Sequence, residues 1–190
     1  LGANGDFDVL PIIGSKELVA WLPTYLESQT VLIPEIAYPT YHVGAVLAGA
    51  KSVPVAIDAH NWPAADLAWL NSPSNPTGRV HSVDEVKACI QWARANKAVL
   101  ISDECYLEFD QNAHSVSVLS QTGGDNTNIL AVHSLSKRSS MAGYRAAFMV
   151  GDSALIARIR EIRKHGGMMV SLPVQKAMTV ALADDVHVYE

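Results

Sequence analysis

Short apolar runs alternate along the whole chain with longer segments, and this alternation limits the fold more than any other feature of the sequence. The runs are rich in Val, Ile, Leu and Ala, and they are continuously apolar, as expected of strands covered by helices on both faces. The segments between them show helical periodicity, and Ser82 precedes acidic Asp84 and Glu85 in the manner of a helix N-cap. The sequence therefore predicts an α/β domain built on a mostly parallel sheet.

The expected strands cover residues 8–13, 30–33, 52–55, 67–71, 98–102, 129–133 and 146–150. The expected helices cover residues 16–27, 41–50, 83–96, 153–164 and 174–183. No internal repeat or linker interrupts this order, so we expect one domain over residues 1–190. Because the sequence begins with Leu1 and not with Met, we expect it to be an excerpt from a longer protein.

The composition is that of a globular chain, and it argues against several classes of function. Hydrophobic residues make up 49% and charged residues 17%, so the chain can bury a substantial core. The net charge of −5 gives no reason to expect nucleic acid or an anionic membrane as a partner. No apolar run approaches the roughly 20 residues of a membrane helix. Cys89 and Cys105 fit neither a metal motif nor a disulfide framework, so we expect no metal site and a cytoplasmic location.

Two polar segments follow expected strands at the edge where open α/β sheets bind ligands. The first is Asn75-Pro76-Thr77-Gly78, which alone could be an ordinary turn. The second begins with Asp103, and Tyr106 follows three residues later. A carboxylate at the end of a buried strand needs a cationic partner, which a protonated pyridine nitrogen could provide. The alternative is that Asp103 only caps a helix.

Two further segments carry the cationic groups of the pattern. Ser134-Leu135-Ser136-Lys137 follows an apolar run, so two hydroxyls flank a lysine that leaves a buried strand. A lysine in such a place can serve as an amine nucleophile, although most lysines are simply solvated. Arg145 follows Lys137 by eight residues and could place its guanidinium on a phosphate or form a salt bridge at a strand end.

Taken in order, the four segments resemble the class I/II aminotransferases, which have the fold-type-I architecture of pyridoxal phosphate enzymes. The resemblance runs through nearly the whole chain and covers the large, cofactor-binding domain of that family. It implies a three-layer αβα sandwich with a mostly parallel seven-stranded sheet, and pyridoxal 5′-phosphate as cofactor. The four-part match is specific to the family and not to one substrate.

The resemblance implies a role for each residue that would surround the cofactor ring. Lys137 would hold the cofactor as a Schiff base and carry the proton between substrate and cofactor. Asp103 would pair with the pyridinium nitrogen and keep it protonated. Asn75 and Tyr106 would donate hydrogen bonds to the ring oxygen. Tyr38 occupies the position of the aromatic residue that stacks on the ring, although an aromatic here could also be a packing residue.

The resemblance also implies a phosphate site at the end of the first expected strand. Ser15 and Lys16 follow Gly14 at the start of a helix, where free backbone N–H groups favour an anion. Ser134, Ser136 and Arg145 would complete the phosphate ligands. On its own, Gly-Ser before a helix is more often only an N-cap.

The substrate is expected from resemblance around residues 10–17 and 33–41, which are most similar to succinyldiaminopimelate aminotransferases. These enzymes move an amino group between glutamate and N-succinyl-2-amino-6-oxopimelate in lysine biosynthesis. In the family, the substrate carboxylate is held by an arginine of the small C-terminal domain, and the enzymes are homodimers. The resemblance therefore implies amino acid and 2-oxo acid substrates, which are small molecules, and a second subunit. The alternatives are an aminotransferase for aspartate, alanine or aromatic amino acids, a C–S lyase on the same scaffold, or a regulator that kept only the cofactor fold.

Overall fold

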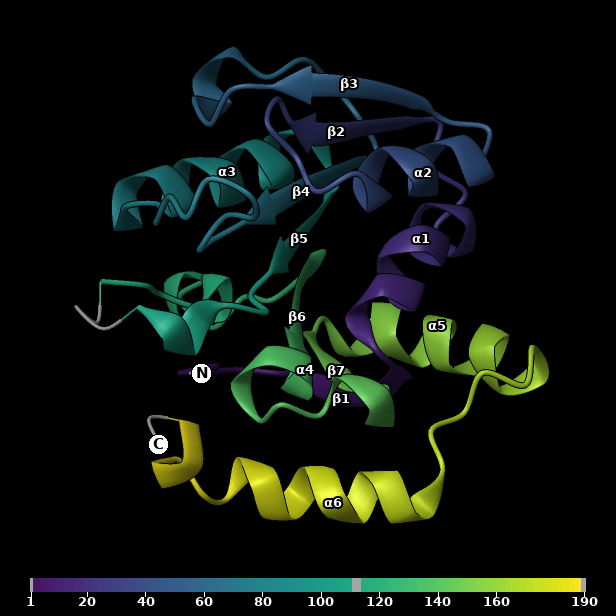
Figure 1. The fold of residues 1–190 in the computed structure, drawn as a ribbon. Coiled ribbons are helices and arrows are strands. Elements are labelled where there is room, and N and C mark those ends of the chain that lie inside the picture. The colour runs from purple at the N-terminus through teal and green to yellow at the C-terminus, as the bar shows by residue number, and fades with distance from the viewer. Residues whose placement is uncertain (1, 111–113, 189–190) are drawn as a thin grey trace.

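The chain forms a seven-stranded sheet between two layers of helices, seen in a computed structural model that describes residues 2–110 and 114–188 (Figure 1). The strands lie in the order β1-β7-β6-β5-β4-β2-β3. Their bounds are Asp8–Ile13 for β1, Thr30–Pro34 for β2, Lys51–Val55 for β3, Leu67–Asn71 for β4, Val99–Asp103 for β5, Ile129–Ser134 for β6 and Ala146–Gly151 for β7. This confirms the predicted α/β architecture and each of the seven strands, with ends that differ by one residue at most.

Strand β7 runs against both of its neighbours, whereas β2 to β6 are parallel to one another. Ile13 at the end of β1 pairs with Ala146 at the start of β7, and Ser134 at the end of β6 pairs with Ala147. The start of β7 therefore lies at the edge where the other strands end. As a result, Arg145 joins the residues that follow β1 and β6.

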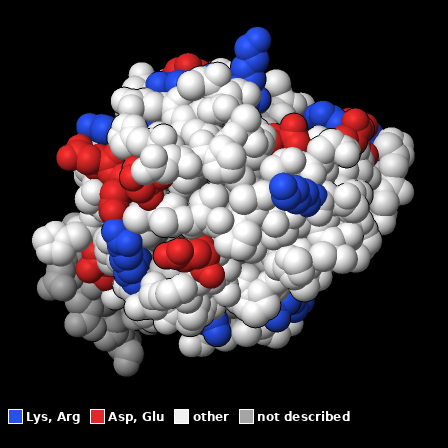
Figure 2. Space-filling model, turned by 90° about the horizontal axis from the view of Figure 1, so that it is seen from above, with Lys and Arg blue, Asp and Glu red and all other residues white. Residues whose placement is uncertain are grey.

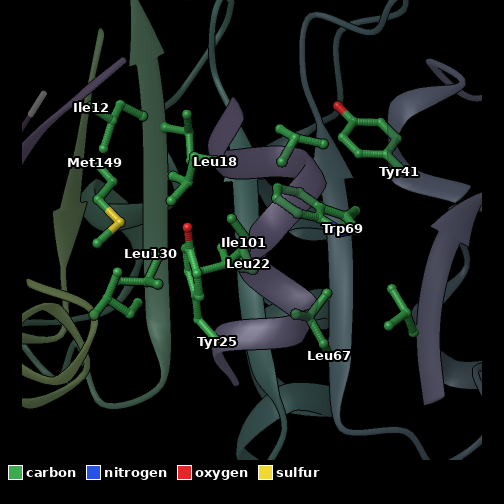
Figure 3. Close-up of a cluster of buried hydrophobic side chains, with 14 of the residues drawn as sticks. Ile12, Leu18, Leu22, Tyr25, Tyr41, Leu67, Trp69, Ile101, Leu130 and Met149 are labelled. Atoms are coloured by element: carbon green, nitrogen blue, oxygen red, sulfur yellow. The ribbon is translucent and has the colours of Figure 1, made fainter. Parts of the chain in front are cut away.

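Helices cover both faces of the sheet (Figure 1). One face carries α1 (Ser15–Tyr25), α2 (Thr40–Leu47) and α5 (Ser153–His165), and the other carries α3 (Val83–Asn96), with α6 (Leu172–Leu182) packed over β7. Figure 3 shows how Leu18, Leu22 and Tyr25 of α1 fill the space between Trp69 and Leu130 on the sheet. Burying these large side chains is the main force that holds α1, and hence its first turn, against the strand ends.

The helix boundaries show where the sequence prediction was right and where it was wrong. The Ser82 cap is confirmed, because its Oγ accepts from the N–H of Glu85 at 3.2 Å while a Glu85 carboxylate oxygen accepts from the N–H of Ser82 at 2.8 Å. Helix α6 begins at Leu172 and not at residue 174, since Pro173 is tolerated in a first helical turn. The short helix α4 (Leu135–Arg138) was not predicted at all.

Charged side chains do not gather into one patch on the face shown in Figure 2. Lys and Arg stand apart there, with Asp and Glu between them. Within residues 2–110 and 114–188, no helix is both long and apolar enough to cross a membrane.

Candidate active site

One cavity of about 360 Å³ lies at the edge of the sheet where the strands end, and all ten predicted site residues line it. This volume is in the range of small-molecule sites in proteins. The predicted residues around it are Ser15, Lys16, Tyr38, Asn75, Asp103, Tyr106, Ser134, Ser136, Lys137 and Arg145. Three residues that the sequence did not indicate, Tyr41, Cys105 and Ala142, complete the lining.

The ends of β4 and β5 form a hydrogen-bonded base for the cavity. Asp103 is 7% exposed, and its Oδ2 accepts a hydrogen bond of 2.8 Å from the hydroxyl of Tyr41. Its Oδ1 accepts from the N–H of Cys105 at 3.2 Å. The Asn71 side chain donates to the carbonyl of Asp103 at 2.9 Å and accepts from the N–H of Asn75 at 2.7 Å. Asn71 therefore links the loop that carries Asn75 to the strand end that carries Asp103.

Aromatic rings form one wall of the cavity. Tyr38 meets Tyr41 edge to face, with ring centroids 5.9 Å apart, and Tyr41 stacks on Trp69 at 5.0 Å (Figure 3). The Nζ of Lys16 lies 5.7 Å from the centroid of the Tyr38 ring. Tyr41 is held from two sides by these contacts, so its hydroxyl is fixed toward Asp103.

Lys137 lies in the short helix α4, directly after the buried strand β6. Ser134 caps this helix, because its Oγ accepts from the N–H of Ser136 at 3.2 Å. The side chain of Lys137 is exposed and borders the cavity. The rigid strand end and the capped turn together place its amine at the edge of the sheet.

Arg145 reaches the cavity across Gly14, and the backbone of both residues is left-handed. Gly14 has φ of 74° and Arg145 has φ of 53°. A Cβ atom added to Gly14 would lie 2.2 Å from Nη2 of Arg145, which no folded structure tolerates without movement. The other guanidinium nitrogen, Nη1, donates to the carbonyl of Ala142 at 2.8 Å. Glycine at this position therefore allows the guanidinium to lie beside the first turn of α1.

The hydroxyl and thiol groups that face Asp103 stay protonated at neutral pH. Burial, followed by the nearby charge of Asp103, raises the pKa of Tyr41 well above its usual value. Burial also raises the pKa of Cys105 well above the usual value for a thiol. The pKa of Tyr106 is raised by burial and then by Cys105 and Asp103. Both tyrosines are therefore hydrogen-bond donors here, and Cys105 is a poor nucleophile.

The family model described as "Aminotransferase class I and II" matches residues 6–189. The chain belongs to this family. It is 53% identical over 185 residues to a Mycobacterium tuberculosis protein named as a probable aminotransferase, covering 94% of the chain and 44% of that protein. It is 50% identical over 187 residues to 4-dedimethylamino-4-oxo-anhydrotetracycline transaminase OxyQ of Streptomyces rimosus, covering 95% of the chain and 52% of OxyQ.

Among solved structures, the chain is similar to a probable N-succinyldiaminopimelate aminotransferase from Thermus thermophilus. The TM-score is 0.88 and the sequence identity 27%, over 96% of this chain and 53% of the other. The chain thus spans about half the length of the relatives it matches.

Class I and II aminotransferases depend on pyridoxal 5′-phosphate, and the cavity of this family member fits that cofactor. The fit rests on three features: a buried carboxylate for the pyridinium nitrogen, an exposed lysine amine on a capped turn, and a cradle at Gly14 that a Cβ would fill. No group of three or more His, Cys, Asp or Glu side chains that could hold a metal ion occurs in the described part of the chain.

Tyr41 is the main residue of the candidate site that the sequence did not indicate. It was assigned only to the start of a helix, because helical periodicity accounted for its apolar ring. Its role is visible only in the fold, where this 0% exposed tyrosine donates its hydroxyl to the buried carboxylate of Asp103. Cys105 also gives no signal in the sequence, since a half-buried cysteine between two site residues is common packing.

Proposed function

We propose that residues 1–190 are the pyridoxal-phosphate-binding large domain of an aminotransferase that moves an amino group between an amino acid and a 2-oxo acid. One observation carries this proposal. Lys137, Asp103, Asn75 and Arg145 come from four separate strand ends, yet they border one cavity.

In this proposal, each side chain near the cofactor ring has one task. When bound, the cofactor ring would act as an electron sink for the electrons released when a proton leaves the substrate Cα. The Lys137 amine would hold the cofactor and, once the substrate amine has replaced it, would carry the proton between the substrate Cα and C4′ of the cofactor. The Asp103 carboxylate keeps the proton on the pyridine nitrogen, and the Tyr41 hydroxyl fixes the orientation of that carboxylate at 2.8 Å. Tyr38 packs against the face of the ring.

The remaining residues orient the cofactor at its two polar ends. Asn75 and Tyr106 donate hydrogen bonds to the ring oxygen, for which Tyr106 must be protonated, as its raised pKa ensures. At the other end, Ser15 and Lys16 at the N-terminus of α1 bind the phosphate together with Ser134, Ser136 and Arg145. These five residues follow β1, follow β6 or precede β7, and these three strands are neighbours in the sheet.

The test of this proposal is to find the lysine that holds the cofactor. Reduction of the cofactor-loaded full-length protein with borohydride, followed by peptide mapping, should place the pyridoxyl label on Lys137. Lys137→Ala should carry no label and show no transamination. A label on Lys16, on Lys164 or on another lysine would overturn the assignment.

We also propose that the full-length protein is a homodimer and that it is located in the cytoplasm. Family enzymes are homodimers with a small C-terminal domain, and a site bordered by exposed Lys137 and Arg145 agrees with an active site that other segments cover. A cytoplasmic location is proposed because Cys89 and Cys105 are both free thiols. Sedimentation of the full-length protein should give the mass of a dimer, and a monomer would overturn this part.

For the substrate, we propose N-succinyl-LL-2,6-diaminopimelate, with 2-oxoglutarate as the amino acceptor. The support is the resemblance of residues 10–17 and 33–41 to enzymes of that type and the similarity to the Thermus thermophilus structure. The relatives with the higher identities carry other names, a general aminotransferase and a tetracycline transaminase. The substrate is therefore to be decided by direct comparison.

A panel of half-reactions on the full-length protein makes that comparison. The change in cofactor absorbance is followed with succinyl-diaminopimelate, glutamate, aspartate, alanine and phenylalanine as amino donors. The proposal expects the succinylated compound and glutamate to react fastest. Faster reaction with aspartate or phenylalanine would remove this substrate and leave the aminotransferase proposal intact.

A further inference from the structure

A buried ion pair lies behind the phosphate-binding end of α1, outside the cavity lining. Glu17 is in the first turn of this helix, two residues after Ser15. Arg163, in the last turn of α5, donates from Nη1 to both carboxylate oxygens of Glu17, at 2.6 Å and 2.8 Å. The Arg163 side chain is 2% exposed and that of Glu17 is 20% exposed. Since water reaches this pair poorly, its charges are weakly screened.

The position of Glu17 creates an electrostatic conflict. Its carboxylate is favourable to the helix itself, because the N-terminal end of a helix is electropositive. The same end of α1 is where a phosphate dianion is expected, and two like charges in one helical turn repel each other. A free carboxylate at Glu17 would therefore weaken the hold of α1 on the phosphate.

Arg163 removes this conflict and also fixes the helix in place. Its charge balances that of Glu17, and its Nη2 donates to the carbonyl of Met168 at 3.2 Å, just after α5 ends. The hydroxyl of Tyr25, at the other end of α1, donates to the sulfur of the same Met168 at 2.7 Å. Both ends of α1 are thus anchored to the segment that follows α5.

We propose that Arg163 is a positioning residue for the cofactor phosphate, which acts by neutralising Glu17 and holding the first turn of α1. This inference rests on the proposed function, because it requires that the phosphate binds at Ser15 and Lys16. Arg163 touches neither cofactor nor substrate in this proposal. Its effect is on the affinity for the phosphate group.

A second ion pair between the same parts of the fold serves as a matched control. Arg158 of α5 pairs with Glu27, just beyond the far end of α1, at 3.2 Å. Its two side chains are 48% and 82% exposed, so the pair is well screened and contributes little. Removal of Arg158 takes a positive charge from α5 without exposing a carboxylate beside the phosphate.

The experiment compares the affinity of the full-length protein for pyridoxal 5′-phosphate with that for pyridoxal, which lacks the phosphate. Arg163→Met should bind pyridoxal 5′-phosphate about tenfold more weakly, the size of a charge effect at a helix end, and pyridoxal as before. Adding Glu17→Gln to Arg163→Met should restore the affinity to within about twofold of wild type. Arg158→Met should leave both affinities unchanged.

Two outcomes would overturn the inference. Equal weakening for both ligands, or no recovery when Glu17→Gln is added, would mean that Arg163 only supports the fold. If Arg163→Met does not fold, Glu17→Gln alone decides, because it should bind pyridoxal 5′-phosphate at least as tightly as wild type. A wild-type protein that binds neither ligand would overturn the proposed function together with this inference, and the labelling of Lys137 separates the two.

Discussion

At the scale of single residues, the carboxylate of Asp103 is buried and accepts hydrogen bonds from the Tyr41 hydroxyl and the Cys105 N–H. If it holds the pyridine proton, Asp103→Ala should retain the cofactor but slow transamination by about three orders of magnitude, or about 4 kcal/mol of barrier. Asp103→Asn should be nearly as slow, because an amide cannot keep the ring protonated. The measurement is the single-turnover rate with a saturating amino donor.

The control for this prediction is Asp8→Ala. Asp8 lies on the edge strand β1, and its half-exposed carboxylate pairs with Arg160 of α5. Such an ion pair contributes about 1 kcal/mol or less to the stability of the fold, so its loss should leave the transamination rate unchanged. A rate for Asp103→Ala within about tenfold of wild type, or about 1.4 kcal/mol, would show that the carboxylate is only structural.

Tyr41 gives a second prediction at this scale. Tyr41→Phe removes the donor to Oδ2 of Asp103 and keeps the ring that stacks on Trp69, so the fold should lose about 1.5–3 kcal/mol, the usual range for a hydrogen bond to a charged group. The rate should fall about tenfold, because the carboxylate is no longer held in one orientation. Thr122→Val is the control: it also removes a buried hydroxyl, which donates to the carbonyl of Leu119 at 3.1 Å, but this hydroxyl lies outside the cavity lining. Equal rates for the two variants would contradict the role of Tyr41.

Residue types explain why the sequence indicated ten lining residues and missed Tyr41. Lys137, Asp103 and Arg145 are charged groups at the ends of apolar runs, where a charge is costly without a partner. Tyr41 satisfies the periodicity of a helix, so nothing local separates it from a packing aromatic. Its hydroxyl meets Asp103 across 62 positions in the sequence, a contact that only the fold creates.

At the scale of elements, the strands were predictable because continuous apolar runs have few other uses in a chain of this length. Helix ends were less predictable than strands, since α1 ends at Tyr25 although the next residues still have helical periodicity. The direction of β7 was not predicted either. It follows from the turn at residues 142–145, in which Arg145 has a left-handed backbone. The residue types in this turn do not reveal that conformation.

The junction of β1 and α1 carries the prediction at this scale. Gly14→Ala adds a Cβ 2.2 Å from Nη2 of Arg145, so the guanidinium must move away from the phosphate end of α1. We expect the affinity for pyridoxal 5′-phosphate to fall about tenfold, since a charge-assisted contact of about 1.5 kcal/mol or more is displaced. Equilibrium titration followed by absorbance measures this.

Gly123→Ala separates the displaced guanidinium from backbone strain. Gly123 has φ of 70° with nothing within 4 Å of an added Cβ, so both variants strain the backbone and only one displaces Arg145. Each should therefore lose about 1–3 kcal/mol of stability, the cost of placing a side chain in a backbone region that favours glycine. A normal cofactor affinity for Gly14→Ala would show that Arg145 does not bind the phosphate.

At the scale of the whole molecule, the fold has apolar surface that nothing in the described residues covers. Leu172 and Val180 on α6 are 74% and 72% exposed, and Met169 before that helix is 66% exposed. Exposed apolar patches of this kind mark contacts with other segments or subunits. Since the relatives are about twice as long, we expect the rest of the protein or a second subunit to cover this surface.

The last prediction follows from that surface and concerns residues 1–190 produced alone. They should fold but self-associate, because water is left in contact with apolar side chains that we expect other segments or a second subunit to cover. Leu172→Glu together with Val180→Glu should reduce the association seen by sedimentation, since both replace exposed apolar groups with charges. Neither form should transaminate, because we propose that residues outside 1–190 supply part of the active site. Steady turnover by a monomer of residues 1–190 would overturn the proposed division of the active site between domains.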